Sequence, residues 1–173
     1  MKQVDIIYLD IDGVLNTMPY DALFKVLGCN GLVYPNSGEY DIVKICNKYL
    51  KTPISSEEFW SKLDREFWAN IHPSPECEWL PDLCGQVVGR KNVFLLSSPI
   101  DNPDCIAGKL EWIYKNLPTW LHRQFIFTHH KWVCAKPDTL LIDDYDMNIQ
   151  KFVAYGGQTI LVPRPWNSQF TRS

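Results

Sequence analysis

Acidic and hydroxyl side chains follow three apolar segments of the chain that are typical of buried strands. Asp10 and Asp12 follow the first segment, Ser97 ends the second, and Asp143 and Asp144 end a later one. The carboxyl ends of parallel strands meet at one edge of a sheet, and ligands bind at that edge. Four carboxylates gathered there would repel one another unless a cation lay among them. Since Mg²⁺ prefers hard oxygen ligands, the sequence predicts a magnesium site at this edge.

Each acidic pair also has a purely structural interpretation. An Asp-Gly pair such as Asp12-Gly13 can form a plain turn, and an Asp-Asp pair can cap the following helix. Both pairs occur in this chain, and a strand that ends in a hydroxyl lies between them in the sequence. This combination favours a catalytic site over two unrelated turns.

Five apolar segments predict the strands that position these residues. They are Val4–Asp10, Asn92–Ser98, Gln124–Thr128, Thr139–Asp144 and Thr159–Pro163. Their nearly continuous apolar character is typical of strands buried on both faces of a parallel sheet. Helical patterns at Asn102–Asn116 and Asp146–Tyr155 separate the later strands. The alternation of strand and helix predicts a doubly wound α/β fold with a five-stranded parallel sheet.

The long segment 16–91 interrupts this alternation, because it carries helical signals and little strand signal. The helices that we expect in it span Asp21–Leu27, Tyr40–Leu50 and Ser55–Asn70, the last opened by a capping box. We therefore expect a small helical cap at 16–91, inserted between the first two strands. Residues 1–15 and 92–173 would form the core.

The composition is that of one folded domain carrying an insertion. Of the 173 residues, 46% are hydrophobic and 21% charged, and the net charge of −3 argues against a nucleic-acid partner. No apolar run approaches the roughly 18 residues of a membrane helix, and the N-terminus does not resemble a signal peptide. We therefore expect a cytoplasmic protein with no membrane partner and six free cysteines. A zinc site of His72, Cys77 and Cys84 is the alternative.

The acidic segments resemble the motifs of a known family, the haloacid dehalogenase-type phosphatases. Asp10–Leu15 (DIDGVL) is similar to their first motif, Ser97 matches the hydroxyl of the second, and Leu140–Asp144 (LLIDD) matches the fourth. The third motif is a lysine, for which the chain offers Lys131 and Lys136. Lys131 follows the carboxyl end of a predicted strand, whereas Lys136 precedes the next strand at the opposite edge. We therefore choose Lys131.

Further segments resemble the 5′(3′)-deoxyribonucleotidase branch of this superfamily and its bacterial and phage relatives. They are Ser98-Pro99-Ile100, the spacing of Cys105, Lys109 and Trp112, Thr128 with Lys131, and Phe67-Trp68 before Pro73-Ser74-Pro75. The resemblance extends from Val4 to about Asn148. The chain departs from the branch at Ser97, which is usually threonine, and at Asp101, where some members place a phosphate-contacting lysine.

The resemblance implies a Mg²⁺-dependent phosphatase that forms an aspartyl-phosphate intermediate. Asp10 would be the nucleophile, and Asp12 would protonate the leaving oxygen and then deprotonate water. Ser97 would donate a hydrogen bond to the phosphate, and Lys131 would neutralise its charge. The implied substrate is a small phosphorylated molecule, a (deoxy)nucleoside monophosphate. A phosphatase of polynucleotide ends is the alternative.

By the same resemblance, the side chain of Asp10 and the backbone carbonyl of Asp12 hold the metal ion. The third ligand is either Asp143 or Asp144, and we favour Asp144 for the direct bond. Asp143 would then bind through water or contact Lys131.

The expected cap brings further candidate residues to the substrate. Met18, Phe67 and Trp68, together with Ser98 of the core, are the substrate contacts that we expect. The alternative is that the cap aromatics only form its hydrophobic core. The sequence fixes neither the base nor the oligomeric state, for which a homodimer is one alternative. It gives no role to Arg164 and Trp166.

Overall fold

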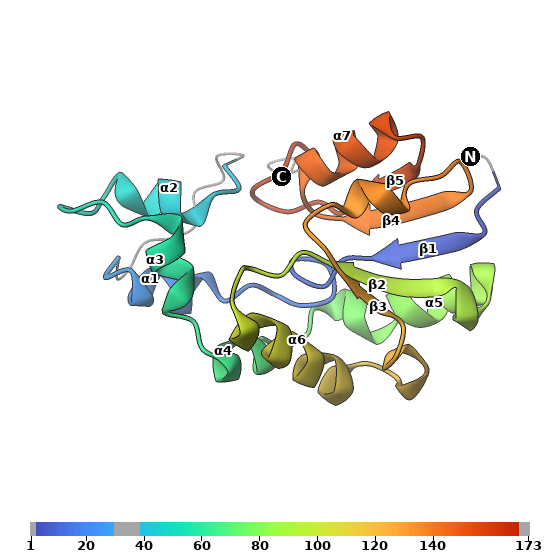
Figure 1. Cartoon of the computed structure of the whole chain (residues 1–173), viewed down its shortest axis with the longest axis horizontal. Coiled ribbons are helices and arrows are strands. Elements are labelled where there is room, and N and C mark those ends of the chain that lie inside the picture. The colour runs from blue at the N-terminus through green and yellow to red at the C-terminus, as the bar shows by residue number, and fades with distance from the viewer. Residues whose placement is uncertain (1–2, 30–38, 170–173) are drawn as a thin grey trace.

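The computed structural model of the chain describes residues 3–29 and 39–169. Within these ranges, five strands form one parallel sheet in the order β3-β2-β1-β4-β5 (Figure 1). They are β1 (Ile6–Leu9), β2 (Val93–Ser97), β3 (Phe125–Phe127), β4 (Thr139–Asp143) and β5 (Gln158–Leu161). The expected parallel sheet is thereby confirmed, and each strand ends within two residues of its predicted bounds.

Helices of very different length join the strands in the described ranges. The α-helices are α1 (Tyr20–Val26), α2 (Ile42–Asn47), α3 (Ser56–Ser61), α4 (Arg65–Ala69), α5 (Leu80–Val88), α6 (Pro103–Asn116) and α7 (Asp146–Ala154). Short 3₁₀ helices are η1 (Pro75–Glu78), η2 (Arg90–Asn92), η3 (Thr119–Leu121) and η4 (Lys131–Cys134). In the described ranges, no helix is sufficiently long and apolar to span a bilayer.

The central strand β1 pairs with β2 on one side and with β4 on the other. Leu9 lies opposite Leu95 of β2 and opposite Ile142 of β4. Because all three strands run in the same direction, their carboxyl ends meet at one edge. The residues that follow these strands are thereby brought together.

Side chains of the strands alternate between two hydrophobic layers, as the period of two in a strand requires. Ile7 and Leu9 of β1 face the larger core. Tyr8 between them faces the other side, where its ring meets Phe152 of α7 at a centroid distance of 6.3 Å. Figure 1 shows α7 on one side of the sheet and α5 and α6 on the other. The sheet whose edge carries the acidic residues is therefore packed on both faces.

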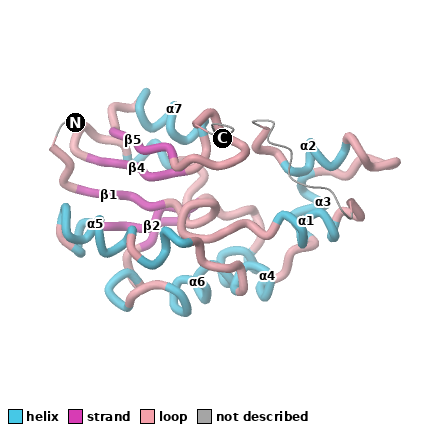
Figure 2. Tube along the Cα trace, turned by 180° about the vertical axis from the view of Figure 1, so that it is seen from behind, coloured by secondary structure: helices cyan, strands magenta, loops and turns pink. Residues whose placement is uncertain are grey.

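Most of the inserted segment lies beyond the carboxyl ends of the strands. Figure 2 shows α1, α2 and α3 gathered there, with α4 beside α6. The last helix of the predicted insertion 16–91 is different, because α5 packs against β1 and β2. The division of the chain into cap and core remains a prediction, and the position of α5 favours a cap that ends before Leu80.

One helix expected from the sequence is two helices in the structure. The predicted start is right, since the Ser55 hydroxyl accepts a hydrogen bond from the Glu58 amide at 3.0 Å. The predicted end at Asn70 is wrong, because α3 stops early and Asp64 begins α4 by accepting from the Phe67 amide at 2.9 Å. An aspartate that caps a new helix competes with continuation of the old one.

Candidate active site

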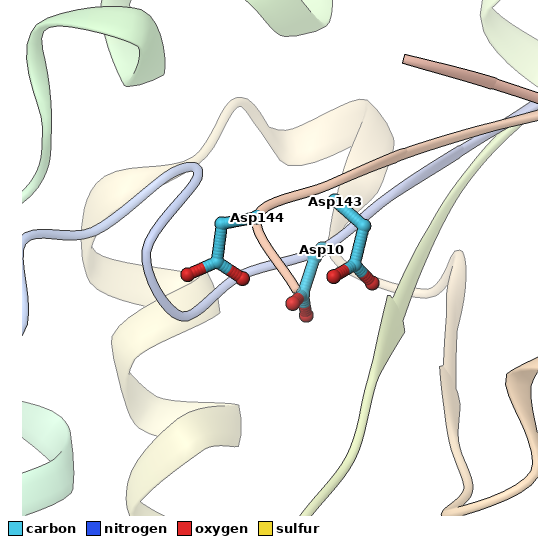
Figure 3. Close-up of side chains that lie close together, drawn as sticks. All are labelled: Asp10, Asp143 and Asp144. Atoms are coloured by element: carbon cyan, nitrogen blue, oxygen red, sulfur yellow. The ribbon is translucent and has the colours of Figure 1, made fainter. Parts of the chain in front are cut away.

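Three buried carboxylates lie together where β1 and β4 end. Asp10 follows β1, Asp143 is the last residue of β4, and Asp144 comes next (Figure 3). One oxygen from each carboxylate lies within 4.8 Å of the others. Among the described residues, this is the group of His, Cys, Asp and Glu side chains that could hold a metal ion. His72, Cys77 and Cys84, the ligands of the alternative zinc site, do not form such a group among the described residues.

Burial and mutual repulsion disfavour the ionised forms of these carboxylates. Burial raises the pKa of Asp10 to about 7, against the opposing charge of Lys131. Burial and the charges of Asp10 and Asp143 raise the pKa of Asp144 well above its usual range. Such a cluster is stable in its ionised form only where positive charge is supplied.

A buried lysine supplies part of this positive charge. Lys131, in η4 just after β3, places its Nζ 2.8 Å from Oδ1 of Asp10 and 2.7 Å from Oδ2 of Asp143. Burial opposes the charge of this lysine, but the two carboxylates raise its pKa above the ordinary value. Lys136 is exposed and precedes β4 at the opposite edge. The structure therefore brings Lys131 to the cluster and leaves Lys136 outside it.

A second buried lysine contacts the other two expected catalytic residues. Lys109 of α6 is 2% exposed, and its Nζ donates hydrogen bonds to the Asp12 carboxylate and, over 3.3 Å, to Oγ of Ser97. Asp12 also accepts from Nδ2 of Asn16 at 2.9 Å. Ser97 is fully buried at the end of β2. Asp12 and Ser97 are thus joined through Lys109.

Lys109 is a residue to which sequence reasoning gave no role. The sequence did contain a signal, because Lys109 lies four residues after Cys105 and three before Trp112, on one face of α6. All three side chains are buried. A lysine on a buried helix face needs a charged partner, so this spacing could have predicted an ion pair.

The fully ionised site carries more negative than positive charge. When ionised, the four carboxylates and two lysines described above leave two negative charges. Within the described part of the chain, Oδ1 of Asp144 is buried and has no hydrogen-bond partner. A buried charged oxygen without a partner is costly. A divalent cation would supply both the missing partner and the missing charge, so the residues fit a metal site.

A cavity of about 360 Å³ opens beside the cluster. Asp12, Asp144 and Ser98 line it on the core side, and Met18 and Trp68 line it on the cap side. The Ser98 hydroxyl lies 3.1 Å from the backbone oxygen of Thr128, to which it donates. Three of the four expected substrate contacts are therefore at this cavity.

The fourth expected contact, Phe67, borders a separate hollow that is lined by residues around α4 and the start of α1. Its ring meets Trp68 edge-on at 5.3 Å. Consecutive residues of a helix point about 100° apart, so only one of this pair faces the cavity.

Trp68 belongs to the cap core and to the cavity wall at once. It is 3% exposed, its ring stacks on Trp60 at a centroid distance of 6.2 Å, and both residues line the cavity. The ammonium group of Lys109 lies 5.1 Å from the Trp68 ring centroid, which is a cation–π distance. Trp68 thus links the cap to the residues that hold Asp12.

Solved structures that resemble this chain are hydrolases of the haloacid dehalogenase (HAD) superfamily. A HAD hydrolase of family IA, variant 3, from Entamoeba histolytica has a TM-score of 0.55 and 12% identity, covering 97% of this chain and 86% of its own. A subfamily IA, variant 1 hydrolase from Geobacter sulfurreducens has a TM-score of 0.54 and 13% identity, covering 91% and 86%. A HAD family enzyme from Bacteroides thetaiotaomicron, in a magnesium complex, has a TM-score of 0.50 and 17% identity, covering 98% of both chains. At these identities the likeness shows the fold alone.

A more specific match comes from the sequence profile of one family. The profile of the 5′ nucleotidase, deoxy (pyrimidine), cytosolic type C protein (NT5C) matches residues 4–173. Because this is nearly the whole chain, the protein belongs to that family. It is a phosphoric monoester hydrolase of HAD type, which confirms the enzyme class expected from the sequence. No curated protein matches the sequence.

Proposed function

We propose that the protein is a Mg²⁺-dependent 5′-nucleotidase that hydrolyses (deoxy)nucleoside monophosphates through an aspartyl-phosphate. The observation that carries this proposal is that the acidic cluster around Asp10 adjoins a cavity walled by aromatic side chains. The first part suits a phosphate and a metal ion, and the second suits a nucleoside.

The metal ion would be held by the Asp10 side chain, the Asp12 backbone carbonyl and the Asp144 side chain. Bound there, it would reduce the repulsion between the nucleophilic carboxylate and the phosphate dianion. Asp143 has a different role in this assignment, because its contacts with Lys131 at 2.7 Å and with the Tyr145 amide at 2.9 Å already occupy its oxygens.

Asp10 is the nucleophile in this proposal. Its Oδ1 accepts from the Ile11 amide at 2.8 Å and contacts Lys131, so the carboxylate is oriented before substrate arrives. We assign attack on phosphorus to Oδ2. Lys131 would remain beside the transferred phosphoryl group and stabilise the charge on its oxygens.

Asp12 serves as the general acid and base. Lys109 contacts both Asp12, which lines the cavity, and the fully buried Ser97. A bound phosphate would offer Lys109 and Ser97 a new hydrogen-bond acceptor. Asp12 would then be free to carry the proton that the leaving oxygen needs, and later to accept one from water.

The cavity favours a nucleotide over a polynucleotide end. Its volume of about 360 Å³ is within the range of small-molecule sites. Trp60 and Trp68 both line the cavity, and a base would bind there beside aromatic rings. Among the described residues that line it, none is a lysine or an arginine. A polynucleotide site would need such side chains for the extra phosphates.

The test is a phosphatase screen of the purified protein with Mg²⁺ and with EDTA. The substrates are ribo- and deoxyribonucleoside monophosphates, sugar phosphates and 3′-phosphorylated oligonucleotides. We expect the highest kcat/KM with nucleoside monophosphates, loss of turnover in EDTA and recovery on adding Mg²⁺. Equal rates with sugar phosphates, or turnover that EDTA leaves intact, would contradict the proposal.

A further inference from the structure

The segment after β5 reaches back to the acidic cluster. The indole Nε1 of Trp166 donates a hydrogen bond to Oδ2 of Asp144 over 2.8 Å. The side-chain amide of Asn167 donates to the backbone oxygen of Asp144 over 2.8 Å and to that of Val162 over 2.7 Å. The side chain and the main chain of Asp144 are therefore both held by this segment.

The Asp144 carboxylate is also confined by the loop that follows β1. The backbone of Gly13 lies so near that a Cβ there would clash with Oδ2 of Asp144 and would be 3.2 Å from the Trp166 ring. Nε of Arg164 donates to the backbone oxygen of Gly13 over 2.6 Å, which fixes the position of this loop. The carboxylate is thus held between a glycine backbone and an indole ring.

The two oxygens of this carboxylate have different surroundings. Oδ2 accepts the indole hydrogen bond, whereas Oδ1 is buried without a hydrogen-bond partner in the described part of the chain. We propose that Trp166 and Asn167 are positioning residues for Asp144, which turn Oδ1 toward the metal ion. This inference rests on the metal site of the proposed function.

The indole also connects the metal ligand to the cap. The ring of Tyr20, at the start of α1, packs against Trp166 with centroids 5.1 Å apart and an interplanar angle of 58°. Trp166→Phe keeps an aromatic ring for this contact and removes the N–H donor. Trp79, which is exposed just before α5, provides the matched control Trp79→Phe.

The test is calorimetric titration of the metal-free protein with Mg²⁺, followed by the Mg²⁺ dependence of phosphatase rate. Loss of a group that orients a metal ligand weakens metal binding by about 10- to 100-fold. We expect this for Trp166→Phe, with kcat near the wild-type value at saturating Mg²⁺, and wild-type binding for Trp79→Phe. Damage to the fold alone would lower kcat in a way that Mg²⁺ does not restore.

Asn167→Ala is the second variant, needed if circular dichroism in EDTA shows that Trp166→Phe does not fold. It should also weaken Mg²⁺ binding. Unchanged Mg²⁺ affinity in a folded variant would overturn the inference, as would a wild-type protein that binds no Mg²⁺. A wild-type protein that binds Mg²⁺ but hydrolyses no nucleotide would instead reject the proposed function, and the titration would still decide the role of Trp166.

Discussion

At the scale of single residues, the site depends on how its buried charges are balanced. Lys131 lies between Asp10 and Asp143, and Lys109 contacts Asp12. Removing one partner of a buried ion pair leaves the other charge without compensation. The resulting loss of stability is larger than the net stabilisation that the intact pair provides. Each lysine therefore affects both the geometry of the carboxylates and the stability of the fold.

Lys131→Ala should damage catalysis far more than Lys136→Ala. Loss of a positive charge that stabilises the transferred phosphoryl group costs on the order of 2–4 kcal/mol in the transition state. Lys136 is exposed at the other edge of the sheet, and its removal should leave kcat/KM near the wild-type value. Steady-state kinetics with a nucleoside monophosphate measure both variants. If the two rates were reversed, the edge argument for the third-motif lysine would be wrong.

The stability of the metal-free protein should fall as the pH rises from about 4 to about 7. The pKa of Asp10 is about 7 in the folded chain, above the unfolded value near 3.9. Between these values the folded state binds more protons than the unfolded state, so the free energy of unfolding decreases with pH. Urea denaturation in EDTA, compared with Asp10→Asn, isolates this contribution. Mg²⁺ should weaken this pH dependence of the free energy of unfolding. If the difference in this free energy between wild type and Asp10→Asn stayed flat or rose with pH, the prediction would be wrong.

At the scale of elements, the strands were predictable because strands buried on both faces are nearly continuous in apolar residues. The helix break before α4 was not predictable from the sequence. The capping preference of Asp64 competes there with an apolar pattern that continues without a break through Trp68. The contact of Lys109 with Asp12 joins residues 97 positions apart. Such a long-range contact needs the packed fold, although the buried spacing on α6 indicated that some partner was required.

Lys109→Met should lower kcat/KM at least tenfold, since Asp12 and Ser97 would lose the group that joins them. Lys115→Met on the same helix is the matched control, because Lys115 is exposed and its side chain donates a hydrogen bond to Asn70, away from Asp12 and Ser97. Kinetics and thermal melts of both variants measure the effect. Breaking a fully buried ion pair destabilises a protein by about 3–5 kcal/mol. The Asp12 side chain is 22% exposed, so Lys109→Met should lower the free energy of unfolding by less than this. Equal kinetics in the two variants would remove Lys109 from the site.

At the scale of the whole molecule, two aromatic pairs join the inserted segment to the residues around Asp144. Tyr40 stacks on Tyr145 with centroids 3.8 Å apart, and Tyr20 packs on Trp166. Tyr40 and Tyr20 also line the cavity. No local pattern in the sequence predicts these pairs, because each joins segments more than 100 residues apart. In the proposed function, the inserted segment would exclude water from the phosphate from this position.

Trp68→Ala should reduce the preference for nucleotides over a generic phosphate ester. Stacking of a base on an aromatic ring contributes about 1–3 kcal/mol, and p-nitrophenyl phosphate carries no base. The measurement is the ratio of kcat/KM for a nucleotide to that for p-nitrophenyl phosphate, in wild type, Trp68→Ala and the exposed control Trp79→Ala. Loosening of the cap core affects both substrates, so it cancels in the ratio. An unchanged ratio would leave Trp68 as a core residue only.

In the proposed mechanism Asp10 is the nucleophile of a metal-dependent phosphatase, and the variant Asp10→Asn removes the attacking group. The amide has nearly the shape of the carboxylate but cannot attack phosphorus. The measurement is phosphate release from a deoxynucleoside monophosphate in saturating Mg²⁺, with Asp104→Asn, exposed on α6, as the control. We expect Asp10→Asn to fold and to lose at least about a thousandfold in kcat, while the control keeps wild-type turnover. Retention of a tenth of the wild-type rate by Asp10→Asn would exclude Asp10 as the nucleophile.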